Sequence, residues 1–472
     1  MVNNYYSLAR SVVLSSRQDV FLYNERLDDL LLQDYPFESP RELIVQARRL
    51  VNLIDRDLET LQTQLEEEKK QLLTDEGLCE DIIDSARIKS QSIGALLSIT
   101  RMIEVSTREY TPQHAVMFVH RLIDGLNLRA AFFLNPIPGL NFSYFNISRF
   151  LDRVSRALGE AERVSETKIV ILSFPQTHQS DPIIHSLLAH EIGHWINDER
   201  KIVENVFARM VPITLGREQV EFIRADIQRR IGAGRIVRES DIMSEFVEQV
   251  QKWLAEVASD LVGTRLLGPA FVFTLANLLS RIQDPDACSS DYPSTRMRAK
   301  IQIEELERHK YGEMLAGLAS QTSLKESGGE LSNHYIALKQ FASSNSQLPP
   351  AMASHLDSMV FDLLQGHLLD LKREVDLILG ELGFSSAMFR EDVPRLVSQL
   401  AALVPPCEIK IGEPASVASI VNSGLVFMET SAIEKVRNLL KDDVIDARQN
   451  VNALTFKAIE LSTIERDMEK SD

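Results

Sequence analysis

The stretch SDPIIHSLLAHEIGHWI, residues 180–196, carries the strongest local signals in this chain of 472 residues. Asp181 suits the N-cap of a helix and Pro182 suits its first helical position, so a helix is predicted to begin there. His190 and His194 are four residues apart within that helix and share one of its faces. We therefore expect an apolar helix that presents two imidazoles in the same direction.

Two imidazoles at this spacing can bind one Zn²⁺, and Glu191 is placed beside the metal to act on its bound water. Neutral imidazoles are good zinc ligands, while a carboxylate can take a proton from water whose pKa the metal has lowered. Gly193 would let another element pack closely against the helix. The alternative is a surface helix with two ordinary histidines.

A third protein ligand is needed, which leaves the remaining coordination position for water and substrate. A histidine ligand of the metzincin kind is excluded, because Asn197 and Arg200 stand where that pattern has its glycine and third histidine. The stretch WLAEVASDLVG, residues 253–263, places Glu256 and Asp260 one turn apart in an apolar helix. Buried carboxylates are costly unless something satisfies them. Glu256 as metal ligand and Asp260 as acceptor for a ligand imidazole would do so.

HEIGH followed by E-V-A-S-D resembles the HExxH plus ExxxD motifs of the gluzincins, the thermolysin-like zinc metallopeptidases. The resemblance implies that His190, His194 and Glu256 bind zinc, that Glu191 is the general base and that Asp260 orients a ligand histidine. It also implies a zincin-like metallopeptidase core.

The long gap between the two motifs is nearer to that of the CAAX-prenyl and heat-shock membrane endopeptidases. The segment DYPSTRMRAKIQ, residues 291–302, is similar to their His-Pro-[Pro/Ser] segment followed by spaced arginines. Tyr292 stands where those relatives commonly have histidine, and its hydroxyl is a candidate donor to a developing oxyanion. Arg296 and Arg298 would bind the acidic side chains of the site or a substrate carboxylate, or else form ordinary ion pairs.

The sequence around the motifs predicts an α+β protein that is predominantly helical. The runs LRAAFFL (128–134), NFSYFNI (141–147) and KIVILSF (168–174) are rich in β-branched and aromatic residues and predict a small sheet. In gluzincins the edge strand equivalent to the third run pairs with an extended substrate, so the resemblance implies strand addition there. Apolar residues at helical spacing cover 41–73, and a second helical stretch spans about 79–108.

These two stretches predict a coiled-coil hairpin, which is either purely structural or a docking arm for a partner or a second copy. Three regions follow from this reading: a helical region over 1–120, the metallopeptidase core over 121–310 and a helical region over 311–472.

The amino-acid composition limits which partners and which compartment we expect for the protein. The net charge of −17 argues against nucleic-acid binding, which needs a cationic surface. The uncharged run between Arg265 and Arg281 contains Pro269 and is too short for a membrane span, so it predicts a buried core helix. Three dispersed cysteines and the absence of a signal-peptide pattern predict a cytoplasmic protein.

The expected function is zinc-dependent hydrolysis of peptide bonds in a protein or peptide substrate. The alternative is a catalytically silent or latent zincin-fold scaffold that works through protein binding, in a bacterial stress or defence complex. Retention of Glu191 argues against the scaffold, because a purely structural zinc has no use for a general base.

Overall fold

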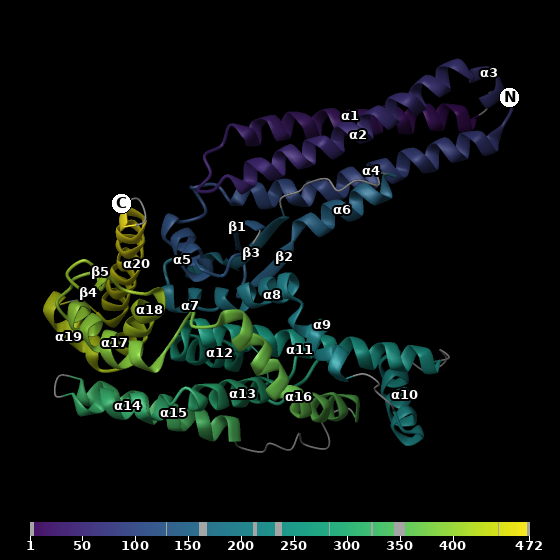
Figure 1. Ribbon diagram of the computed structural model, residues 1–472. Coiled ribbons are helices and arrows are strands. Elements are labelled where there is room, and N and C mark those ends of the chain that lie inside the picture. Colours follow the sequence, from purple (N-terminus) through teal and green to yellow (C-terminus); the bar gives the residue numbers. More distant parts are fainter. Residues whose placement is uncertain are drawn as a thin grey trace. The chain divides into compact units, whose positions relative to one another are not determined.

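A computed structural model describes residues 4–128, 130–159, 168–210, 215–231, 238–282, 284–321, 324–343, 355–441 and 443–469 (Figure 1). Most of these residues are helical, and the strands form a three-stranded and a two-stranded sheet. The predicted class, α+β and predominantly helical, is confirmed. No helix among the described residues combines the length and the apolar character needed to cross a lipid bilayer.

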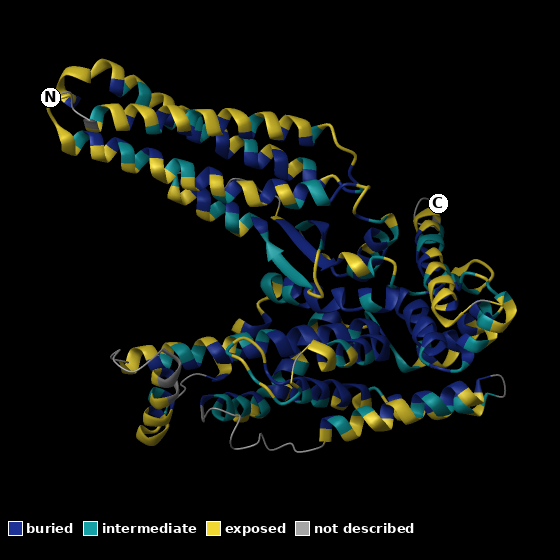
Figure 2. Cartoon of the chain, turned by 180° about the vertical axis from the view of Figure 1, so that it is seen from behind, coloured by how far each residue is buried: buried dark blue, intermediate teal, exposed yellow. Residues whose placement is uncertain are grey.

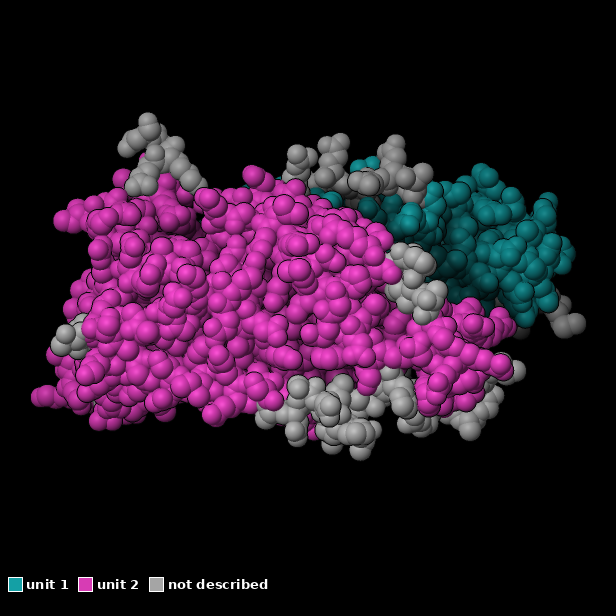
Figure 3. Space-filling view, turned by 60° about the horizontal axis from the view of Figure 1, so that its bottom comes forward, with its two compact units in different colours: residues 1–116, 129–176 teal, residues 117–128, 177–472 magenta. Residues whose placement is uncertain are grey.

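The contacts divide the chain into two compact units, coloured separately in Figure 3. Unit 1 contains residues 1–116 and 129–176, and unit 2 contains 117–128 and 177–472. The sheet therefore groups with the N-terminal helices, although the sequence placed it in one region with the HExxH helix. The reason is packing, because the first strand contacts two of the N-terminal helices.

Unit 1 is built on long helices that bury one face each. Its helices are α1 (Asn4–Leu31), α2 (Ser39–Glu67), α3 (Lys69–Leu72), α4 (Glu76–Val105) and α6 (Ile147–Ala157). Helices α2 to α4 are those predicted from the apolar spacing, and α1 packs against both α2 and α4. Figure 2 shows the resulting stripes of buried and exposed residues along these helices. Whether this bundle binds a partner or a second copy stays a prediction.

The three predicted strands are present as β1 (Ala130–Ile137), β2 (Ser143–Asn146) and β3 (Lys168–Pro175). Strand β3 lies in the middle, parallel to β1 and antiparallel to β2. The expectation that the third run is an edge strand open to a substrate backbone was wrong. Its central residues are apolar and buried, and they pair with a strand on each side, which leaves no open edge between Val170 and Ser173.

Unit 2 holds the HExxH stretch and the C-terminal helices, and α5 (Gln113–Ile123) runs across the boundary between the units. Its first elements are η1 (Gln176–His178), α7 (Pro182–His185), α8 (Leu188–Arg200), α9 (Ile202–Met210), α10 (Arg217–Ile231), α11 (Glu239–Leu267), α12 (Pro269–Ile282) and α13 (Thr295–Arg308). Those that follow are α14 (Tyr311–Ser320), α15 (Lys325–Ser343), α16 (His355–Leu379), α17 (Ser386–Ala401), β4 (Glu408–Lys410), β5 (Glu413–Pro414), α18 (Val417–Met428), α19 (Ala432–Leu440) and α20 (Val444–Glu469).

Helix α11 lies at the core of unit 2 and contacts α8, α9, α12, α13 and α16. It ends at Gly268, whose φ of 60° favours glycine, and Pro269 begins α12. The uncharged run was predicted to be a buried core helix, and most of it is buried across this junction. Asn422 of α18 fastens the junction, since its side chain donates to Leu267 O at 2.8 Å and accepts from Ala270 N at 3.1 Å.

Candidate metal centre

The helix start predicted at Asp181 is confirmed. The Asp181 carboxylate accepts hydrogen bonds from the amides of Ile183 and Ile184, and Pro182 occupies the first helical position. The helix is interrupted after one turn, and α8 then carries the HExxH residues. His190 and His194 lie on one face of α8, with their Nε2 atoms 3.1 Å apart.

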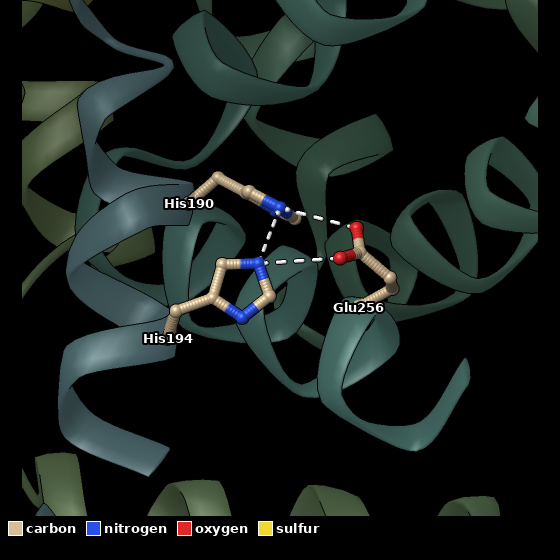
Figure 4. Close-up of side chains that lie close together, drawn as sticks. All are labelled: His190, His194 and Glu256. Atoms are coloured by element: carbon tan, nitrogen blue, oxygen red, sulfur yellow. Dashed lines mark hydrogen bonds and ion pairs between the residues drawn. The ribbon is translucent and has the colours of Figure 1, made fainter. Parts of the chain in front are cut away.

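Glu256 of α11 completes the group, as the sequence predicted (Figure 4). Its Oε2 atom lies 3.3 Å from His190 Nε2, and its Oε1 atom lies 3.3 Å from His194 Nε2. The potential ligand atoms of the three residues all lie within 4.8 Å of one another. Two imidazole nitrogens and a carboxylate oxygen, converging from two helices, form a donor set that suits zinc. Among the described residues this is the one such group of three or more.

Close packing of α8 on α11 brings the ligands together. A Cβ atom added to Gly193 would lie 2.5 Å from Ser259 Cα, far inside van der Waals contact. Ser259 lies between Glu256 and Asp260 on α11, so the two helices touch beside the ligands. The close approach predicted for Gly193 is confirmed.

Replacing Gly193 with alanine should therefore separate the ligands. We expect Gly193→Ala to lower zinc affinity at least tenfold and to destabilise the protein by about 1–3 kcal/mol, because the added methyl must displace the α11 backbone. Competition with a chromogenic chelator and urea unfolding would measure the two effects. Gly94→Ala in α4, where a Cβ atom meets nothing within 4 Å, is the control. Unchanged zinc affinity would show that helix spacing does not control the site.

Asp260 orients His190, as predicted. The Nδ1 atom of His190 lies 2.8 Å from Asp260 Oδ1 and donates to it, which turns the Nε2 atom toward His194 and Glu256 (Figure 4). Arg298 in turn binds Asp260 through two bonds, Nε to Oδ2 at 2.7 Å and Nη2 to Oδ1 at 2.8 Å. Although burial opposes ionisation, the charge of Arg298 and its hydrogen bond hold the pKa of Asp260 below its usual range.

The ionisable side chains of the centre shift one another's pKa values. Burial opposes protonation of His190, yet its hydrogen bond with Asp260 and the nearby carboxylate of Glu256 raise its pKa to about 10. Burial also opposes ionisation of Glu256, but the imidazoles of His190 and His194, each 3.3 Å from a carboxylate oxygen, hold its pKa well below the usual value. The carboxylate of Glu256 is therefore ionised and available as a ligand at neutral pH.

One buried oxygen of the group lacks a hydrogen bond within the described part of the chain. Glu256 Oε2 makes no hydrogen bond of good geometry among the described residues, although His190 Nε2 and Arg298 Nη2 lie at 3.3 and 3.6 Å. A buried carboxylate oxygen without a donor is unfavourable, and a cation between it and the two imidazoles would satisfy it. The residues present thus fit a zinc ion.

Glu191 is buried, with 6% of its surface exposed, and follows His190 on α8. Burial raises its pKa, and the charges of His190 and His194 oppose this shift. A buried carboxyl group beside the three potential ligands is suited to accept a proton and to return it.

The two arginines of the segment 291–302, Arg296 and Arg298, lie in different environments. Arg298 is buried and binds an acidic side chain of the site, which was one of the two open alternatives. Arg296 instead binds Asp286 at 2.6 and 3.0 Å and stacks over the ring of Phe341. It forms an ordinary ion pair outside the centre.

Tyr292 is exposed, with 47% of its surface accessible. Partial burial and then the charges of Glu256 and Glu191 raise its pKa, so the phenol lies within electrostatic range of both carboxylates. The segment around Tyr292 is held by a hydrogen bond from Trp253 Nε1 to the Ser289 carbonyl at 3.0 Å. The sequence did not predict this contact. The only signal for Trp253 was its position one turn before Glu256 on α11.

His185, the histidine that precedes the HExxH motif in the same stretch of sequence, lies apart from the metal group. It is fully buried and packs edge-on against Phe118 and Phe456, with ring centroids 6.2 and 5.4 Å apart. Its ring is thus part of the apolar core and takes no part in the metal group. His185 is the last residue of α7 and His190 lies on α8, so the break between the two helices separates the two rings.

The geometry defines a helix-rich α+β protein with a His-His-Glu group that can hold a metal. No protein-family model, curated protein or solved structure matches the chain. The resemblance to gluzincins therefore depends on the motif residues and on the way they converge.

Proposed function

We propose that this protein is a gluzincin-type zinc metallopeptidase that hydrolyses peptide bonds. The observation that carries the proposal is the convergence of His190, His194 and Glu256 with the buried Glu191 next to them. A structural zinc site uses closed sets of four ligands, whereas three protein ligands leave a position for water. A buried carboxyl group beside that position is what hydrolysis needs and what a structural site does not use.

His190, His194 and Glu256 would hold the ion, which when bound supplies a water of lowered pKa and an electrophile for the carbonyl oxygen. Glu191 accepts the proton of the attacking water and returns it to the leaving amine. Asp260, held by Arg298, keeps the His190 imidazole in the required tautomer. Tyr292 donates its hydroxyl hydrogen bond to the carbonyl oxygen as negative charge develops there.

The substrate is a protein or peptide, and we place the enzyme in the cytoplasm. Cys79, Cys288 and Cys407 are free thiols, which supports a reducing compartment.

The proposal is tested by zinc content and hydrolysis measured together. Purified wild type should carry one zinc per chain and cleave a labelled, denatured protein mixture. A chelator should abolish this activity and added zinc should restore it. Glu256→Ala should lose most of its zinc, because one of three ligands is gone, with an affinity loss of at least about 100-fold.

Glu248→Ala is the matched control, since Glu248 lies two turns earlier on α11 and forms an exposed pair with Lys252. A metal-free wild type, or full zinc retention by Glu256→Ala, would contradict the ligand assignment. Full zinc binding without hydrolysis of any peptide would favour the scaffold alternative.

A further inference from the structure

The turn before α13 is closed by its own hydrogen bonds. The hydroxyl of Ser289 accepts from the amide of Tyr292 at 2.9 Å and from that of Asp291 at 3.2 Å. The amide of Ser289 donates to the carbonyl of Tyr292 at 2.9 Å. Ser289 therefore fixes the backbone on both sides of the Tyr292 side chain.

The same turn is attached to α11. Trp253 is fully buried and donates from Nε1 to the Ser289 carbonyl at 3.0 Å. Lys252 Nζ lies 2.8 Å from Asp291 Oδ1 and forms a partly exposed ion pair. Because Trp253 lies one turn before Glu256, the turn is held beside the metal group.

The other end of the turn is also fixed to the centre. Ser294 is buried and caps α13 by accepting from Met297 N at 3.3 Å. One turn further along, Arg298 binds Asp260. The segment carrying Tyr292 is thus held at one end through Trp253 and at the other through Arg298, and both attachments lead to residues of α11.

We propose that Ser289 is a positioning residue for Tyr292, and that it holds the phenol hydroxyl where the carbonyl oxygen of the substrate acquires negative charge. This role rests on the proposed peptidase function. Ser289 acts only through Tyr292, because its hydroxyl and its carbonyl are both engaged in holding the turn. Displacement of a catalytic group by even about 1 Å can cost up to 100-fold in rate, so the support of this turn has a measurable effect.

The test is a double-mutant cycle on zinc-loaded, full-length protein, with a fluorogenic peptide that the wild type cleaves. Tyr292→Phe should lower kcat about 100-fold, as expected for removal of one oxyanion donor. Ser289→Ala should lower kcat about tenfold with KM and zinc content unchanged. In the Tyr292→Phe background, Ser289→Ala should have no further effect, because the group it positions is absent.

Two further variants separate positioning from general loop stability. Ser289→Thr keeps an acceptor hydroxyl and should retain most of the wild-type kcat. Ser290→Ala alters a neighbouring hydroxyl that bonds to neither amide and should leave kcat unchanged.

Equal losses from Ser289→Ala in the wild-type and Tyr292→Phe backgrounds would overturn the proposal, as would an unaltered kcat in Ser289→Ala. Neither outcome contradicts the proposed function, provided that the wild type cleaves the peptide and needs zinc to do so. A wild type that holds zinc but cleaves no peptide overturns the proposed function and this role with it.

Discussion

Glu191→Gln is expected to keep one zinc per chain and to lose hydrolysis by about 10³-fold, within the range that general acid–base catalysis contributes. The change removes a proton acceptor while it keeps the shape of the side chain. Glu191 is buried next to His190 but is not one of the three potential ligands. Zinc affinity should therefore change little, and kcat should fall while KM stays near its wild-type value.

The measurement is the initial rate of peptide cleavage at equal zinc occupancy, checked by elemental content. Glu204→Gln is the matched control, because this exposed carboxylate at the start of α9 forms a surface pair with Lys201. A Glu191→Gln protein that cleaves peptides at the wild-type rate would assign the base to another residue. One that loses its zinc would make Glu191 a ligand.

Arg298→Met is expected to give the largest loss of stability, about 3–5 kcal/mol in the free energy of unfolding, because the buried carboxylate of Asp260 loses its bidentate partner and keeps the hydrogen bond from His190. Arg298 and Asp260 expose only 4% and 1% of their side chains and form two hydrogen bonds. The same substitution should also weaken zinc binding, since an Asp260 side chain that is no longer held by Arg298 does not orient His190. We expect zinc affinity to fall about 10- to 100-fold.

The pH dependence of this loss has a definite sign. The folded-state pKa of Asp260 is depressed, so its pairing with Arg298 contributes stability above the usual aspartate pKa of 3.8. This contribution is lost as the pH falls through the folded-state pKa. The difference between wild type and Arg298→Met, measured by urea unfolding of the metal-free proteins, should therefore shrink on acidification.

Two further variants serve as comparisons for Arg298→Met. Arg296→Met breaks a more exposed pair, and we expect a loss of only about 1–2 kcal/mol. Asp260→Asn combined with Arg298→Met removes both charges and should recover part of the stability that Arg298→Met loses. A loss in Arg298→Met no larger than in Arg296→Met would mean that the buried pair contributes little.

Much of the site could be predicted because its signals are local. Asp181 and Pro182 mark a helix start through their own backbone chemistry, and the four-residue spacing of His190 and His194 places both rings on one helical face. Glu256 was predicted from a second motif whose apolar surroundings make a buried carboxylate unfavourable without a partner. In each case a few neighbouring residues carry the information.

The remainder depends on contacts between segments that are distant in sequence. The run at 168–174 predicted a strand and the family resemblance implied an open edge, but the pairing of this strand with β1 and β2 made it central and closed it to substrate. The sequence left Arg298 between two alternatives, and the packing of α13 on α11 decided for Asp260. Hydrophobic periodicity specifies which face of an element is buried, whereas the partner of that face is decided when the whole chain packs.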